Sequence, residues 1–183
     1  MASSPKSSRQ PVPATDEEAD QADQVDEIVD QWATQRPDLD TLAMEVFGRI
    51  YRVGKLMGDR LEETYQRHGI GRGEFDVLST LRRSGEPYQL APSSLAATMM
   101  LTTGGMTGRL DKLERARLIE RVPDPEDRRA MRARLTARGK ALIDTAVGAG
   151  VEEQNAVLAQ LPEESRRELA RLLRLLLAAG NRT

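Results

Sequence analysis

The chain has 183 residues, enough for one domain with a sizeable hydrophobic core. It has no cysteine and a single histidine, which excludes disulfides, thiolate metal sites and histidine-rich metal sites. The net charge of −2 hides an asymmetry, because residues 1–40 carry ten acids and three bases whereas residues 101–140 carry eleven bases and six acids. A basic stretch of this kind is typical of a nucleic-acid-binding face, although a solvated surface also explains it.

The first residues read as a tail. Residues 1–24 are rich in Ser, Pro, Gln and acidic residues and have little to bury, so we expect them to be disordered. No apolar stretch is long enough to span a membrane, and no secretion signal is visible. We therefore expect a cytoplasmic protein without membrane contact, folded over residues 25–183.

Two helices are expected next. The first begins near Asp23, and its apolar positions form one stripe of Val25, Ile28, Val29 and Trp32. Trp32 is the only tryptophan, and it either packs this helix onto the body or lines a pocket. The second helix is long, with Asp38 or Asp40 as its cap and Gly69 as its stop.

A third helix fits GRGEFDVLSTLRR, residues 71–83, with Phe75, Leu78 and Leu81 facing inward. Asp76 lies in this apolar setting and must be exposed or paired, because an unpaired buried carboxylate is costly. The following GEPYQLAPSS is a turn-rich connection.

A helix-turn-helix pattern follows. SSLAATMM suits a short helix capped by Ser93 or Ser94, and a tight turn leads to a second helix capped by Thr102 or Thr103. The second helix has Met106, Leu110 and Leu113 on one buried face. Its start carries Gly104, Gly105 and Gly108, although glycine costs a helix about 1 kcal/mol relative to alanine. The glycines indicate either close approach to a large surface such as a major groove or a poorly formed helix start.

A β-hairpin is expected after this helix. LIERVP suits a short strand, DPEDRR a turn in which Asp124 and Asp127 bond local backbone, and AMRARLT a strand of alternating polarity. A hairpin directly after a helix-turn-helix predicts a winged helix, and a surface hairpin with solvated arginines is the alternative.

The chain is expected to end in two helices. One starts at Thr136, and the last starts at Pro162 and carries a leucine stripe larger than one small domain needs, which indicates a second subunit. The predicted fold class is therefore mainly α with a small β-wing. A winged helix-turn-helix would occupy residues 70–136, and helices within 25–68 and 137–180 would pair two copies of the chain.

The predicted DNA-contacting residues lie on the second helix and at the wing tip. Arginines at a wing tip suit phosphates or a narrow A·T minor groove. The candidates are Thr102, Thr103, Gly104, Thr107 and Lys112 on the helix, with Arg128 and Arg129 on the wing.

Residues from about 70 to 145 resemble the MarR family of winged-helix transcriptional regulators. The resemblance rests on EFDVLSTLRR, on SSLAATMMLTTGGMTGRLDKLERARLIE and above all on DPEDRRAMRARLT followed by ARGK. It implies a homodimer that binds double-stranded DNA at a pseudo-palindromic operator, as a repressor, with activation left open.

A narrower likeness concerns GGMTGRLDKLE, the added tryptophan-bearing helix and the aspartate of FDVL, which together are similar to the urate-responsive, PecS-type branch. That resemblance implies a site for a small anionic effector such as urate, formed by Trp32, Asp76, Arg109 and Arg121. On a helical wheel Arg109 lies at the edge of the buried stripe, so a ligand bound there would turn the helix away from the groove. Without the resemblance, a structural Asp76–Arg109 ion pair is the simpler reading.

Other functions are less well supported by the residues. No glycine-rich phosphate loop, metal-ligand cluster or catalytic constellation is visible, so neither an enzyme nor a cofactor other than an effector is expected. The alternatives are a regulator of the same family that responds to a different phenolic or aromatic ligand, and a helical protein-interaction module without DNA binding.

Overall fold

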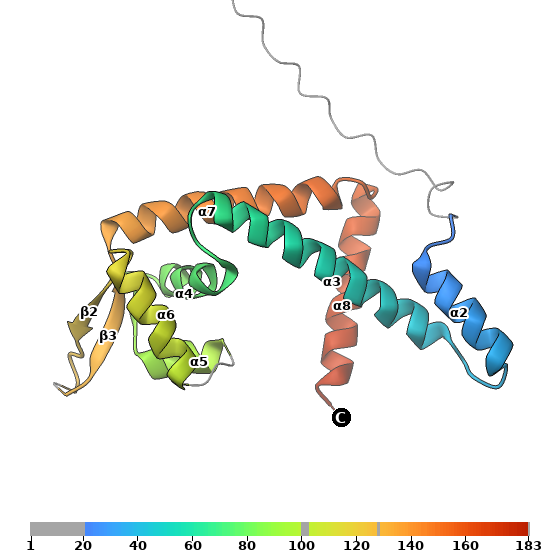
Figure 1. Ribbon diagram of the computed structural model, residues 1–183, viewed down its shortest axis with the longest axis horizontal. Helices are drawn as coiled ribbons and strands as arrows, with labels where there is room; N and C mark the ends of the chain where they lie inside the picture. The colour runs from blue at the N-terminus through green and yellow to red at the C-terminus, as the bar shows by residue number, and fades with distance from the viewer. Residues whose placement is uncertain (1–20, 100–102, 128, 183) are drawn as a thin grey trace, which may run out of the picture. The chain divides into compact units, whose positions relative to one another are not determined.

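The computed structural model describes residues 21–99, 103–127 and 129–182 (Figure 1). The predicted tail therefore lies almost wholly outside the described residues. The elements, in chain order, are α2 (Gln24–Gln35), α3 (Leu42–Arg67), α4 (Arg72–Arg83), β1 (Gln89–Leu90), α5 (Pro92–Thr98), α6 (Thr103–Arg115), β2 (Ile119–Pro123), β3 (Met131–Leu135), α7 (Ala137–Leu158) and α8 (Glu163–Gly180). The predicted fold class, mainly α with a small β-wing, is confirmed.

The chain divides into two compact units. The first unit is Met1–Leu56 with Gln154–Thr183, and the second unit is Met57–Glu153. The long helices α3 and α7 contribute to both units, so the boundary falls inside these helices rather than in a loop between elements.

The hydrophobic core described by the structure belongs to the second unit. Leu78 and Leu81 of α4 are fully buried, as expected, and they join Leu95 of α5 and Ile143 of α7. Phe75 is only half-buried and stacks on Tyr65 with 3.8 Å between the ring centroids. Residues of α5, α6 and the wing strands belong to this same core, which therefore holds these elements together.

The sheet has three antiparallel strands in the order β1-β3-β2. The expected hairpin is present, with Ile119 opposite Leu135 and Pro123 opposite Met131. Strand β1 was expected to be part of a turn-rich connection, because two residues show no alternation. It forms because Gln89 pairs with Arg134 and Leu90 with Ala133 on the open side of β3.

The helix boundaries follow local signals. Asp23 caps α2, Asp40 accepts a hydrogen bond from Leu42 N at 3.1 Å before α3, and Gly69 ends α3 with a φ of +75°. The prediction of Ser93 or Ser94 as the cap of α5 is wrong: the helix begins at Pro92 with Ala91 at its N-cap, because proline suits the first helical position.

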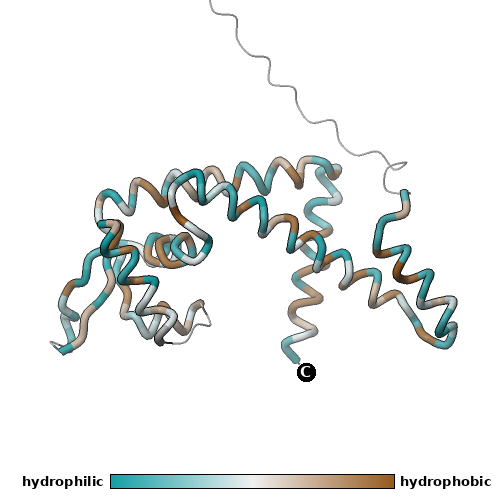
Figure 2. Tube along the Cα trace, viewed as in Figure 1, coloured by the Kyte–Doolittle hydropathy of each residue, from teal (hydrophilic) through white to brown (hydrophobic). Residues whose placement is uncertain are grey.

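The first unit exposes much apolar surface. Val25 is its one buried hydrophobic residue among those described, whereas Trp32 is 44% exposed and does not pack as first expected. All but three of the exposed large hydrophobic residues of the described chain lie in this unit, the exceptions being Met131, Val147 and Val151. Figure 2 shows such hydrophobic positions along α3 and α8, interleaved with hydrophilic ones. Within the described ranges, no helix is both long and apolar enough to cross a membrane.

Candidate nucleic-acid interface

Helix α6 is held by its predicted buried face. Met106, Leu110 and Leu113 are 1%, 2% and 1% exposed. They pack in the same core as Leu95 of α5, so the two helices of the helix-turn-helix share one apolar support. The opposite side of α6 faces outward and is the surface available to a groove.

This outward surface is polar and carries small residues. Gly105, Thr107 and Gly108 are exposed, and a methyl group added at Gly108 would meet no other atom within 4 Å. Packing inside the chain therefore does not require glycine at position 108. A missing side chain at this place instead allows a large partner to approach the helix closely, as a groove floor would.

Two basic side chains join α6 to the first turn of α4. Lys112 Nζ lies 3.0 Å from Glu74 Oε1, and Arg109 Nη1 donates to the Gly73 carbonyl oxygen at 3.5 Å. Glu74 Oε2 also accepts from Gly71 N at 2.8 Å, so this side chain satisfies the backbone N–H at the N-cap of α4. Partial burial raises the pKa of Glu74, but the hydrogen bonds from Lys112 and Gly71 outweigh it and leave the pKa below its usual value.

The opposite flank of α6 is joined to the wing. Arg121 of β2 binds Asp111 and also lies 3.3 Å from Glu114 Oε2, both on α6. A small pocket of about 90 Å³ lies beside this contact, and Thr107, Leu110 and Arg121 are among its lining residues. Helix α6 thus has a charged connection on each side of its exposed surface.

The wing turn is organised by Asp124. Its carboxylate accepts from Glu126 N at 2.9 Å, as expected, and also from Arg132 Nε at 2.6 Å. The hydrogen bond from Arg132 is the main reason that the pKa of Asp124 lies below its usual value, followed by the hydrogen bond from Glu126 N. The pair fixes the base of the loop that carries Arg129, which is exposed.

The wing is anchored to α7 by a close approach. Thr136 Oγ1 donates to the Arg117 carbonyl oxygen at 2.8 Å and accepts from Gly139 N at 3.0 Å. A methyl group at Gly139 would overlap the Leu118 carbonyl oxygen and lie 2.8 Å from its carbon. Only glycine allows α7 to start this close to the end of α6.

The predicted DNA-contacting residues are placed in part. Thr107 and Lys112 are exposed on α6, and Arg129 is exposed on the wing. Lys112 also forms an ion pair with Glu74. Thr102 and Arg128 lie outside the described residues. Thr103 and Gly104 belong to α6, but how exposed these two residues are lies outside the described part of the structure.

The four predicted effector residues, all within the described ranges, make no hydrogen bond or ion pair with one another. The Asp76–Arg109 ion pair, which was the alternative to an effector site, does not form: Asp76 pairs with Arg72 one turn earlier on α4, at 3.3 Å, while Arg109 contacts Gly73. Arg121 faces acids of α6 on its other flank. Trp32 lies on α2 in the first unit, so its grouping with the other three stays a prediction.

Glu74 and Asp124 Oδ2 have partners that the sequence analysis missed. The partner of Glu74 is 38 residues away, beyond any local pattern. Arg132 could have been predicted as the partner of Asp124 from the hairpin pattern alone. The two strands place Arg132 opposite Val122, close to the turn that contains Asp124.

Comparison with known proteins supports a regulator. Residues 68–130 match the model of the MarR family. The HTH-type transcriptional regulator PecS of Dickeya dadantii is 39% identical over 150 residues, which cover 82% of this chain and 90% of that protein. The HTH-type transcriptional repressor YetL of Bacillus subtilis is 26% identical over 135 residues, covering 74% of this chain and 80% of that protein.

The fold is also found in solved structures. A mutant MarR of Escherichia coli complexed with operator DNA superimposes with a TM-score of 0.63 at 22% identity, over 80% of this chain and 97% of that chain. At this identity the likeness concerns the fold. The two relatives are named as transcriptional regulators, which agrees with a DNA-facing helix and wing rather than with a catalytic site.

Proposed function

The chain belongs to the MarR family of transcriptional regulators, and from this premise we propose that it is a homodimeric repressor that releases its operator on binding a small anion such as urate. Each α6 would enter a major groove, with half-sites about one helical turn apart. Thr107, Lys112 and Arg129 are the described side chains that would contact DNA, together with the predicted residues outside the described part.

One observation carries the DNA-binding proposal. The exposed surface of α6 around Gly108 is free of side-chain bulk, and it lies between two charged connections, to α4 and to the wing. A helix that reads a major groove must approach the bases closely and be held in a fixed orientation. The small residues of α6 would allow the first, and its two charged connections would favour the second.

The homodimer is supported by the first unit. Exposed leucines on α8, among them Leu169, Leu172 and Leu173, and exposed residues of α3 such as Phe47 form more apolar surface than a stable monomer leaves in water. A second copy of the same surface would cover them with twofold symmetry.

The effector proposal is supported by the position of two arginines. Arg109 and Arg121 lie on opposite flanks of α6, and each is held by weak or exposed partners, namely the Gly73 carbonyl oxygen and two surface carboxylates. An anion that bound either guanidinium would compete with these contacts and shift α6. The likeness to the urate-responsive branch is the reason to name urate.

A mobility-shift experiment tests the DNA-binding proposal. The DNA upstream of the protein's own gene is compared with a scrambled duplex of equal length and composition at one fixed salt concentration. We expect specific binding at least about 10³-fold tighter than binding to the scrambled duplex. Equal affinity for the two duplexes would leave only non-specific binding and reject an operator in this DNA.

A further inference from the structure

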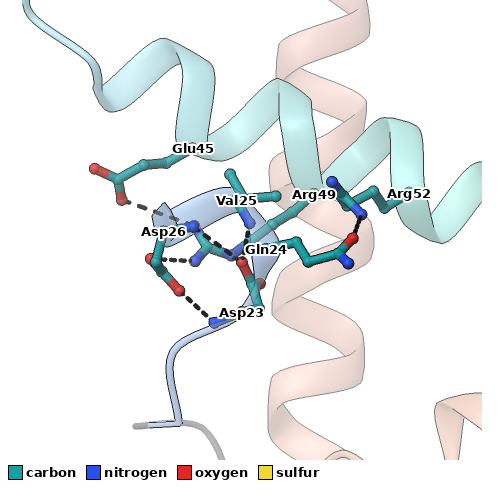
Figure 3. Close-up of polar contacts among 7 residues, drawn as sticks. All are labelled: Asp23, Gln24, Val25, Asp26, Glu45, Arg49 and Arg52. Atoms are coloured by element: carbon teal, nitrogen blue, oxygen red, sulfur yellow. Dashed lines mark hydrogen bonds and ion pairs between the residues drawn. The ribbon is translucent and has the colours of Figure 1, made fainter. Parts of the chain in front are cut away.

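The start of α2 is fixed to α3 by a cluster of charged side chains, which Figure 3 shows. Arg49 of α3 donates from Nε to Asp23 Oδ2 at 2.9 Å and from Nη2 to Asp26 Oδ1 at 2.6 Å. We call this three-residue contact the Arg49 clasp. A guanidinium group can bind two carboxylates with separate N–H donors that point in fixed directions. The donors of an ammonium group are not fixed in this way.

The same two carboxylates cap α2. Asp23 accepts from Val25 N at 2.6 Å and from Asp26 N at 3.2 Å, while Asp26 accepts from Asp23 N at 2.8 Å. This is a capping box, which satisfies N–H groups that a helix start leaves open. Because the capping oxygens and the clasp belong to the same side chains, the first turn of α2 is stabilised by docking on α3.

One apolar contact lies beside the clasp. Val25 is 3% exposed, and it packs so closely on α3 that a methyl group at Gly48 would lie 3.0 Å from its Cγ1. Gln24 binds Arg52 next to it. Further along α2, Ile28 is 42% and Trp32 is 44% exposed. Among the described residues, the attachment of α2 to α3 is therefore concentrated at its first turn.

We propose that Arg49 is a positioning residue for the effector response, because its clasp fixes α2 at one end and thereby sets where Trp32 lies. This inference rests on the proposed function and on the prediction, made from the sequence, that Trp32 contacts the effector. Trp32 follows Asp26 by about 9 Å along the helix axis at 1.5 Å per residue, so a rotation about the clasp displaces the indole. The hydrogen bond from Arg49 lowers the pKa of Asp26, as expected for a carboxylate bound by a guanidinium group.

The clasp is tested first without any effector. Arg49→Gln is compared with Arg171→Gln, which removes a two-bond contact with Glu168 inside α8 and joins no second element. Amide hydrogen exchange reports on residues 25–35, and fluorescence anisotropy reports on Trp32, the single tryptophan. We expect about tenfold faster exchange in α2 and lower anisotropy for Arg49→Gln alone. Arg49→Lys, which keeps the charge, should fall between it and the wild type.

The positioning role is tested next by titrating urate against the protein–DNA complex. Arg49→Gln should raise the urate concentration at half-release about fivefold, with DNA affinity before urate within about twofold of the wild type. Circular dichroism and sedimentation establish that the variant is folded and has the wild-type oligomeric state.

Each outcome decides one step. Unchanged exchange and anisotropy would overturn the clasp. A loosened α2 with an unchanged urate midpoint would overturn the positioning role. If the wild-type complex does not respond to urate, the proposed effector is wrong and the positioning role falls with it, whereas the exchange data still decide whether the clasp holds α2.

Discussion

At the scale of single residues, basic side chains on both flanks of α6 have partners that another anion can replace. Lys112 is an exposed lysine engaged by the largely buried carboxylate of Glu74, and Arg121 is engaged by Asp111 and Glu114 in contacts that are exposed on both sides. Exposed ion pairs contribute little to stability, so exchanging them for phosphate or for a bound anion costs little. Their role is to set the orientation of α6 in the absence of such a partner.

A substitution at Gly73 tests the contact between Arg109 of α6 and the first turn of α4. A methyl group at position 73 would lie 2.8 Å from the Arg109 guanidinium carbon, and the flexible end of Arg109 would move away. Gly73→Ala should therefore change the urate concentration at half-release by about fivefold, with little effect on folding because alanine favours helix. Fluorescence anisotropy of labelled DNA measures this midpoint. Gly58→Ala on α3, where an added methyl group would meet no atom within 4 Å, is the control. Equal urate midpoints for the two variants would show that Arg109 takes no part in the urate response.

Asp124 gives a pH dependence of known sign. Its pKa is lowered in the folded chain, chiefly by the hydrogen bond from Arg132, so its contribution to stability is present above the unfolded value of about 4 and is lost as pH falls through the folded value. In urea denaturation at fixed protein concentration, Asp124→Asn should be less stable than the wild type at pH 7, and the gap should narrow below pH of about 4. A gap of equal size at pH 7 and pH 3 would show that the Asp124 charge does not stabilise the wing.

At the scale of elements, the periodicity of apolar residues predicts which face of a helix is apolar, and packing decides whether that face is buried. The spacing of Met106, Leu110 and Leu113 identifies the buried face of α6, and all three are buried. The spacing of Val25 and Ile28 predicts a buried stripe on α2, yet only Val25 is buried, because a stripe does not say which partner covers it. The Glu74–Lys112 contact could not be predicted, since it depends on how α4 and α6 cross.

The junction of α6, the wing and α7 depends on Gly139. Its replacement by alanine would force α7 away from the Leu118 backbone, because the added methyl group would overlap the carbonyl oxygen. We expect Gly139→Ala to lower the free energy of unfolding by about 3 kcal/mol and the melting temperature by roughly 6–12 °C in calorimetry. Gly148→Ala in the same helix meets no atom within 4 Å and should be neutral or slightly stabilising. Equal melting temperatures would contradict the close approach.

At the scale of the whole molecule, the two units differ in what they bury. The second unit contains the described core and the DNA-facing elements, whereas the first unit leaves its leucines and other large apolar residues exposed. In the homodimer that we propose, the first unit would acquire its core by association, and this association would also place two copies of α6 on one operator.

A charge placed in the α8 stripe tests this division. Leu173→Glu should give a monomer in analytical ultracentrifugation and lose at least about tenfold in operator affinity, because one half-site no longer assists the other. Arg174→Gln alters the net charge by the same amount away from the stripe and should stay dimeric. A Leu173→Glu protein that sediments like the wild type would show that α8 does not pair the copies.

In the function that we propose, a small anion releases this regulator from DNA. The direct measurement is fluorescence anisotropy of a labelled duplex from upstream of the protein's own gene, bound by the wild-type protein and titrated with urate at fixed salt, with neutral hypoxanthine as the comparison. We expect saturating urate to weaken DNA affinity by about tenfold or more and hypoxanthine to have no effect. Anisotropy that stays constant throughout the urate titration would contradict this expectation.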